Sequence, residues 1–132
     1  MKSKFLSGSA ISYDLGLLII RLFTGGLMLT HGFPKLQKLV AGDLQFGDPL
    51  GVGQEISLVL AVLAEFVCSI LVILGLFTRV AVIPLAVTMA VAFFIVHSAD
   101  PLQIKELSLV YLTVFVGLFF TGPGRYSIDG KR

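Results

Sequence analysis

Four long runs of apolar residues, separated by short polar stretches, dominate this 132-residue chain. They cover about residues 13–32, 56–77, 80–96 and 107–121. A helix needs roughly 20 apolar residues to cross the hydrocarbon core of a bilayer, so the fourth run is short and borrows its polar flank by snorkelling. The third run has no polar stripe, which a helix of a water-soluble bundle would need. The pattern predicts an all-α, integral membrane bundle of four transmembrane helices, in a single domain over residues 1–132.

Composition supports lipid as the solvent. Hydrophobic residues make up 56% of the chain and charged residues 14%, and the mean hydropathy is +0.97. Soluble domains carry about 25% charged residues, so this chain has too little charge to cover a water-facing surface. The net charge of +2 is mild and no nucleic-acid motif is present, so the expected partner is the lipid bilayer rather than nucleic acid.

The placement of basic residues predicts the orientation. Four spans put both termini on one side, together with most of the cations: Lys2, Lys4, Arg79, Arg125, Lys131 and Arg132. The opposite side holds Lys35, Lys38 and Lys105. The positive-inside rule then places both termini in the cytoplasm. We expect the first run to be retained as a span, because Arg21 interrupts it and no A-x-A cleavage site follows.

The longest connection is the first outer loop, from Phe33 to Glu55. Residues 33–40 are apolar at helical spacing, with Pro34 where a first helical turn tolerates proline. This predicts a short interfacial helix in the loop. The glycine-broken remainder is expected to cap the outer mouth of the bundle.

Two ionisable residues, Arg21 and Glu65, fall inside predicted spans. Charges inside a membrane are costly and tend to be functional. Arg21 shares one helical face with Gly25, Met28 and His31, and a long arginine could bridge the expected difference in depth to Glu65. The two charges are predicted to form a buried ion pair. Such a pair would either fix helix register or lie beside a ligand or proton path, and both alternatives remain open.

A second group of polar residues lies at the outer helix ends: His31, His97, Lys35, Lys105 and Glu106. Histidine and lysine here could meet lipid head groups, or donate hydrogen bonds to quinone carbonyls. No single helix has the spacing of a metal site, so no metal is predicted. The candidate ligand-binding set is Arg21, His31, Glu65, His97 and Glu106. No catalytic residue can be named. The single cysteine, Cys68, argues against a self-contained thiol exchanger of the vitamin K epoxide reductase kind.

Several short motifs, modest alone but specific in order and spacing, extend from about Leu17 to Asp129. They are Arg21-Leu22, Gly25-Gly26, His31-Gly32, Lys35-Leu36, Glu65, Leu74-Gly75-Leu76, Thr78-Arg79, Glu106 and the tail Gly122-Pro123-Gly124-Arg125-Tyr126-Ser127-Ile128-Asp129. In these motifs the chain resembles the DoxX family of small bacterial inner-membrane proteins.

This resemblance implies a multi-pass protein of the bacterial inner membrane with a link to quinone-coupled redox chemistry. The expected function is a membrane subunit of a quinone-linked redox system. The chain has no flavin, haem or iron–sulfur motif, so it would be an accessory oxidoreductase subunit that needs a protein partner, with quinone as its ligand. The alternatives are a non-catalytic scaffold or assembly factor and, third, a small transporter. Small-residue helix faces also permit a homo-oligomer.

Overall fold

The computed structural model describes residues 5–131, and this part of the chain is helical with no strand. The first span is α1, Tyr13–Val40. The second is one continuous helix made of α2 (Gln54–Val62), the π-helix η1 (Leu63–Cys68) and α3 (Ser69–Leu74). The third joins α4 (Thr78–Val91) to the π-helix η2 (Ala92–Val96), and the fourth is α5 (Leu102–Thr121). A short 3₁₀-helix, η3 (Asp129–Lys131), follows.

Four of these helices are long and apolar enough to cross a membrane: Tyr13–Val40, Gln54–Leu74, Thr78–Val96 and Leu102–Thr121. The predicted all-α fold with four transmembrane helices is therefore confirmed. The fourth span begins five residues earlier than predicted and is 20 residues long. It reaches membrane-spanning length by including the polar flank with Lys105 and Glu106, as the sequence predicted.

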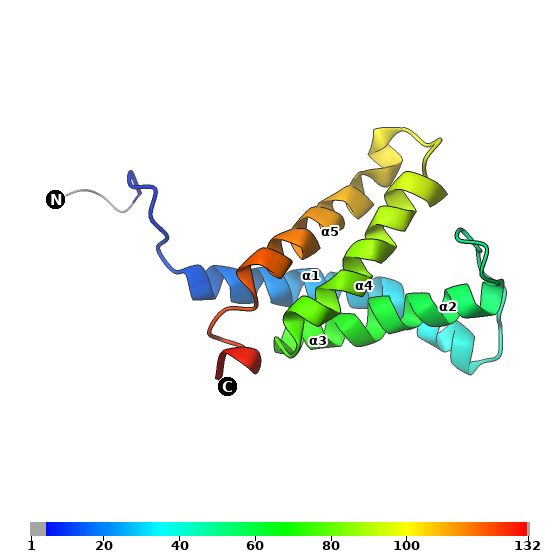
Figure 1. The fold of residues 1–132 in the computed structure, drawn as a ribbon, viewed down its shortest axis with the longest axis horizontal. Helices are drawn as coiled ribbons and strands as arrows, with labels where there is room; N and C mark the ends of the chain where they lie inside the picture. Colours follow the sequence, from blue (N-terminus) through cyan, green and yellow to red (C-terminus); the bar gives the residue numbers. More distant parts are fainter. Residues whose placement is uncertain (1–4, 132) are drawn as a thin grey trace.

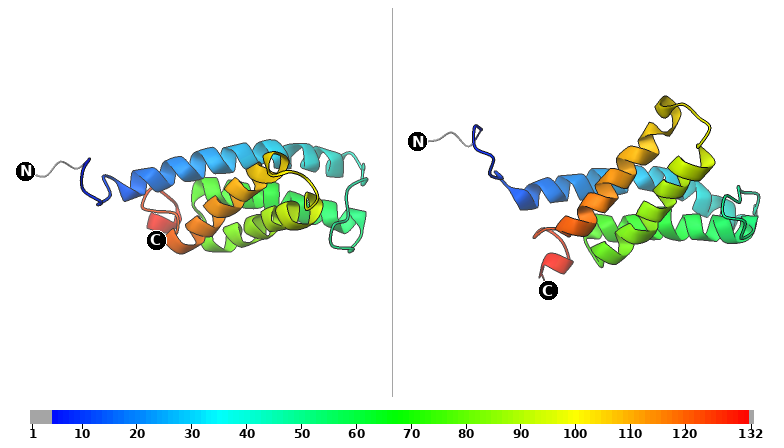
Figure 2. Two further views of the ribbon diagram at one scale, coloured as in Figure 1. Left: turned by 90° about the horizontal axis from the view of Figure 1, so that it is seen from above. Right: turned by 45° about the horizontal axis from the view of Figure 1, so that its top comes forward.

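The four spans form two antiparallel hairpins that cross and then separate. The first hairpin is α1 with α2–η1–α3, and the second is α4–η2 with α5 (Figure 1). We call the end where α1 begins and α5 ends the terminal end, and the opposite end the distal end. The hairpins lie together near the terminal end, and α4 and α5 diverge from α1 and α2 towards the distal end, as the right-hand view in Figure 2 also shows.

Two glycines let α1 pack directly on the second span. A Cβ atom at Gly25 would lie 3.2 Å from the Ser69 carbonyl oxygen, and one at Gly32 would collide with the backbone of Glu65. Glycine is the residue that permits such a close approach between membrane helices. The small, polar faces of the first and second spans thus meet, as the sequence predicted.

The predicted short interfacial helix is not a separate element. Residues 33–40 are helical, but they continue α1 without a break, and Pro34 lies inside that helix. A proline removes one N–H group and bends a helix without necessarily ending it. Nothing else in the segment favours a stop until Gly42, which has a positive φ of 79°.

The orientation of the bundle remains a prediction, and reporter fusions can test it. A green fluorescent protein fused after Arg132 should fluoresce and an alkaline phosphatase there should be inactive, because the cation-rich end should remain in the cytoplasm. An alkaline phosphatase inserted at Gly47, in the distal loop, should be active and serves as the matched control. The opposite pattern of activities would refute the orientation.

Candidate functional site

A cavity of about 510 Å³ lies between the two hairpins at the distal end. Its walls come from all four spans and from the loop between α1 and α2. Most of the lining is apolar. The polar side chains among the lining residues are His31, Lys35, Ser57, Glu65, Thr88, His97, Ser108 and Tyr111. An apolar pocket of a few hundred Å³ with a few convergent polar groups is the usual form of a small-molecule site.

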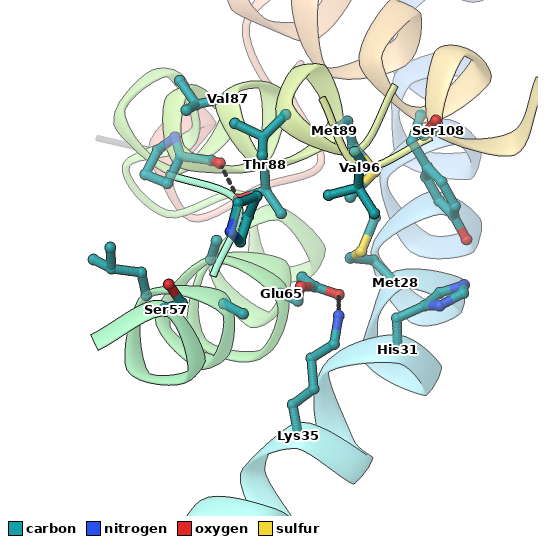
Figure 3. A pocket seen from close by; sticks show the side chains of 18 of the residues that line it. Met28, His31, Lys35, Ser57, Glu65, Val87, Thr88, Met89, Val96 and Ser108 are labelled. Carbon is teal, nitrogen blue, oxygen red and sulfur yellow. Dashed lines mark hydrogen bonds and ion pairs between the residues drawn. The ribbon is translucent and has the colours of Figure 1, made fainter. Parts of the chain in front are cut away.

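The strongest charges in this cavity form an ion pair. Lys35 Nζ lies 2.5 Å from Glu65 Oε1, and the side chains are 28% and 4% exposed. In Figure 3 the pair lies between Ser57 and Val87 on one side and His31 and Ser108 on the other. A pair in such surroundings is weakly screened, so it presents both a strong donor and a strong acceptor to anything that enters.

Both π-helical segments border the cavity. Glu65 lies in η1, where Ser69 Oγ donates a hydrogen bond of 2.7 Å to the Glu65 carbonyl oxygen. In the second hairpin, η2 contributes Ala92 and Val96 to the lining and is followed directly by His97, which also lines the cavity. Single turns of π-helix inside α-helices occur frequently at functional sites. The coincidence of both segments with one cavity supports its assignment as the candidate site.

Both predicted histidines line the cavity. The His31 ring meets the Tyr111 ring edge-on, with centroids 5.9 Å apart, which joins α1 to α5. His97 Nδ1 lies 2.7 Å from Asp100 Oδ2 just beyond η2. The two histidines thus share one cavity but have different neighbours. In the part of the chain that the structure describes, no three His, Cys, Asp or Glu side chains converge as a metal site would require.

The loop between α1 and α2 covers the distal mouth of the cavity, as predicted, since Phe46, Pro49 and Leu50 contribute to its lining. Asp48 holds this loop to the start of α2. Its carboxylate accepts bonds of 2.9 Å from the Gly53 and Val52 N–H groups and one of 3.1 Å from Ser57 Oγ. These bonds, that of Gly53 foremost, hold the pKa of Asp48 below its ordinary value. The anchor is therefore present at neutral pH and is lost only as the pH falls through this lowered pKa.

Arg21 does not belong to the cavity, and the predicted Arg21–Glu65 ion pair is not formed. The Arg21 side chain is 1% exposed and lies near the terminal end. Its guanidinium donates to the carbonyl oxygens of Ile73 at 3.2 Å and Val72 at 3.5 Å, and also to that of Tyr126. Arginine near the carboxyl end of a helix is favoured by unpaired carbonyls and by the helix dipole.

The prediction was wrong because the register of the first two spans could not be read from the sequence. Gly32 packs on Glu65, and Gly32 follows Arg21 by eleven residues, or about 16 Å along the helix. An arginine side chain cannot reach that far. Lys35 lies next to Gly32 on the same face and therefore pairs with Glu65 instead.

Glu106, another predicted site residue, is exposed and does not line the cavity. Its neighbour Lys105 lies over the Phe93 ring, 4.7 Å from the centroid. The candidate set missed Tyr111 and Lys35. Lys35 could have been found, because it follows Met28 and His31 at helical spacing. A polar-tipped aromatic such as Tyr111 within an apolar run is the corresponding signal in the fourth span.

A family model named DoxX matches residues 16–98. The chain belongs to the DoxX family. A protein of Haemophilus influenzae described only as uncharacterized is 33% identical over 87% of this chain and 89% of its own length. The inner membrane protein YqjF of Escherichia coli is 32% identical over 88% of this chain and 91% of its own.

A third relative, from Bacillus subtilis, is named "Putative oxidoreductase CatD" and is 29% identical over 89% of this chain and 87% of its own length. No solved structure matches this chain. With four spanning helices and relatives of this kind, the DoxX-family chain is a multi-pass protein of the bacterial inner membrane.

Arg21 is expected to contribute to stability rather than to ligand binding. Arg21→Met should lower the free energy of unfolding by about 3 kcal/mol, because its charged hydrogen bonds to the carbonyl oxygens of Val72, Ile73 and Tyr126 are lost. Unfolding in mixed detergent micelles measures the change. The control is Arg79→Met, since Arg79 is exposed and donates one bond of 2.9 Å to Phe119 O. Equal losses in the two variants would contradict this role.

The Lys35–Glu65 pair should show the behaviour of a buried ion pair. Lys35→Met should lower the free energy of unfolding by about 3 kcal/mol. This is the low end for buried ion pairs, because part of Lys35 is exposed. The double variant Lys35→Met/Glu65→Met should recover much of that loss, since no unpaired carboxylate remains. Lys38→Met, which breaks the exposed pair between Lys38 and Asp43, should cost well under about 1 kcal/mol. Additive losses at positions 35 and 65 would refute the coupling.

Proposed function

We propose that this DoxX-family protein binds a membrane quinone in the distal cavity and acts as the membrane subunit of a quinone-linked redox system. The observation that carries the proposal is the Lys35–Glu65 ion pair, enclosed in a cavity whose walls are otherwise largely apolar. A site for a lipid-soluble ligand with a polar head needs this combination of surfaces.

The donors in the cavity fit the head group of a quinone. A quinone ring carries carbonyl oxygens that accept hydrogen bonds and has no charge of its own. The Lys35 ammonium has three N–H donors and gives one to Glu65. His31 on α1 and Ser108 on α5 offer further polar atoms to the cavity. The remaining lining, which includes Met28 and Ala64, would enclose the ring, and the volume of about 510 Å³ is of the size that holds small ligands.

A bound quinone would supply two-electron, two-proton redox chemistry. The chain's own residues would orient the head group and hold protons at Lys35 Nζ and on the His31 ring, next to the Glu65 carboxylate. Electrons would come from a partner protein, because the sequence has no motif for a flavin, haem or iron–sulfur cluster. The name of the Bacillus subtilis relative supports an oxidoreductase setting for this family.

Quinone retained during purification tests the proposal. Wild-type protein extracted with its native lipids should carry quinone in an amount comparable to the protein, measured by solvent extraction and mass spectrometry. The variant Lys35→Met/Glu65→Met keeps the cavity but removes its charges, and should lose about tenfold in affinity, as 1.4 kcal/mol of binding free energy predicts. The control is Lys38→Met/Asp43→Met, which removes the exposed pair nearby.

Absence of quinone from wild-type protein, even after quinone is added to the membranes, would refute the proposal. Equal retention in the two double variants would also refute the assigned site. A complex that keeps full activity with Lys35→Met/Glu65→Met would instead favour the scaffold or assembly-factor alternative.

A further inference from the structure

The cavity has an apolar edge between α2 and α4. Near the terminal end, α4 packs against α3 and η1, but its contact with α2 is minor at most. The edges of this gap are Leu60 on α2 and Val87 on α4, which both line the cavity and are 50% and 53% exposed. Pro84, one turn before Val87, is also exposed and lines the cavity. We call this gap, bordered by Leu60, Pro84 and Val87, the lateral opening.

The lateral opening lies at the depth of the acyl chains. Val87 is nine residues, about 14 Å, along the helix from Thr78, and Leu60 is fourteen residues, about 21 Å, from Leu74. The hydrocarbon core is about 30 Å thick. Both residues therefore face lipid tails rather than water, and the opening connects the cavity with the interior of the bilayer.

Two other sides of the cavity are occupied by protein contacts. The distal mouth lies under Phe46 and Leu50 of the loop between α1 and α2. Between α1 and α5 the rings of His31 and Tyr111 are in contact. In Figure 3 the Lys35–Glu65 pair, the polar centre of the cavity, lies between His31 on one side and Val87 on the other.

We infer that the ligand is a tailed amphipath that enters sideways from the bilayer. Its hydrogen-bonding head lies on Lys35 and Glu65, and its apolar tail leaves through the lateral opening between α2 and α4. The identity of the head as a quinone rests on the proposed function, whereas the route does not. With this route the ligand does not have to pass through water. Its apolar tail stays in hydrocarbon, so no free energy is needed to transfer it into water.

Two substitutions that should block the lateral opening, which we call plugs, and two matched control substitutions test the route. Leu60→Trp and Val87→Trp place a large ring at the lateral opening. Leu63→Trp and Ile83→Trp place the same ring on the same spans, at positions that are each 50% exposed and do not line the cavity. All four positions face lipid, so the variants should fold alike, which size-exclusion profiles and thermal midpoints will verify.

The first measurement is independent of any quinone. A fatty acid with a photoactivatable diazirine a few carbons from its carboxyl head is mixed with wild-type protein in vesicles, and adducts are mapped by mass spectrometry. Adducts are expected at Met28, which is fully buried and lines the cavity. The plugs should reduce them about tenfold relative to the controls, an effect equal to 1.4 kcal/mol of lost access. Wild-type protein without adducts at Met28, or equal adducts in plugs and controls, would overturn the lateral route.

The second measurement compares a quinone with an isoprenoid tail and the same ring without a tail. The plugs should weaken binding of the tailed quinone about tenfold and leave the tail-less ring within about twofold of wild type. Failure of wild-type protein to bind either ring would sink the proposed function but not the route. Plugs that leave tailed-quinone binding unchanged, in a wild type that binds it, would overturn the route alone.

Discussion

Helix ends near a membrane must find hydrogen-bond partners within the protein, and this constraint organises the terminal end. The last four carbonyl groups of α3 are all satisfied. Leu76 N–H bonds to Leu71 O and Gly75 N–H to Val72 O, Arg21 donates to Ile73 O, and Ile128 N–H bonds to Leu74 O at 3.1 Å. At the start of α4, the Asp129 carboxylate accepts a hydrogen bond of 3.1 Å from the Thr78 N–H group. One end of the bundle is thereby fixed, and the hairpins diverge only at the other.

The divergence gives the two buried charges of the sequence different surroundings. Arg21 donates to the backbone carbonyls of Val72 and Ile73 at the end of α3, so its charge stabilises the fold. Glu65 lies at the wall of a cavity, where Lys35 is its ion-pair partner. The Glu65 carboxylate and the Lys35 ammonium face the cavity rather than the backbone. They can therefore replace their mutual contact with hydrogen bonds to a ligand. A buried charged side chain is therefore structural near the terminal end, as in Arg21, and available for ligand binding near the distal end, as in Glu65.

Hydropathy alone predicted the four spans, because apolar length is set by bilayer thickness and needs no knowledge of packing. The facing of Gly25 and Gly32 towards the second span also followed from helical periodicity. The ion-pair partner of Glu65 did not, since it depends on the offset between two helices. That offset is set by the packing of Gly25 on the Ser69 carbonyl and of Gly32 on the Glu65 backbone. Continuation of α1 beyond Pro34 escaped prediction for a related reason: tertiary contacts of Lys35 outweigh the local tendency of proline to mark a helix start.

The tail contacts impose an order on biosynthesis. Arg125 N–H bonds to Asp14 at the start of α1, and Asp129 reaches the turn between α3 and α4, more than fifty residues earlier in the chain. During synthesis the first hairpin must therefore enter the bilayer before the partners of its terminal end exist. The hydrogen bond from Arg21 to the Tyr126 carbonyl can form only after residue 126 has been synthesised. Closure of the terminal end therefore requires nearly the whole chain.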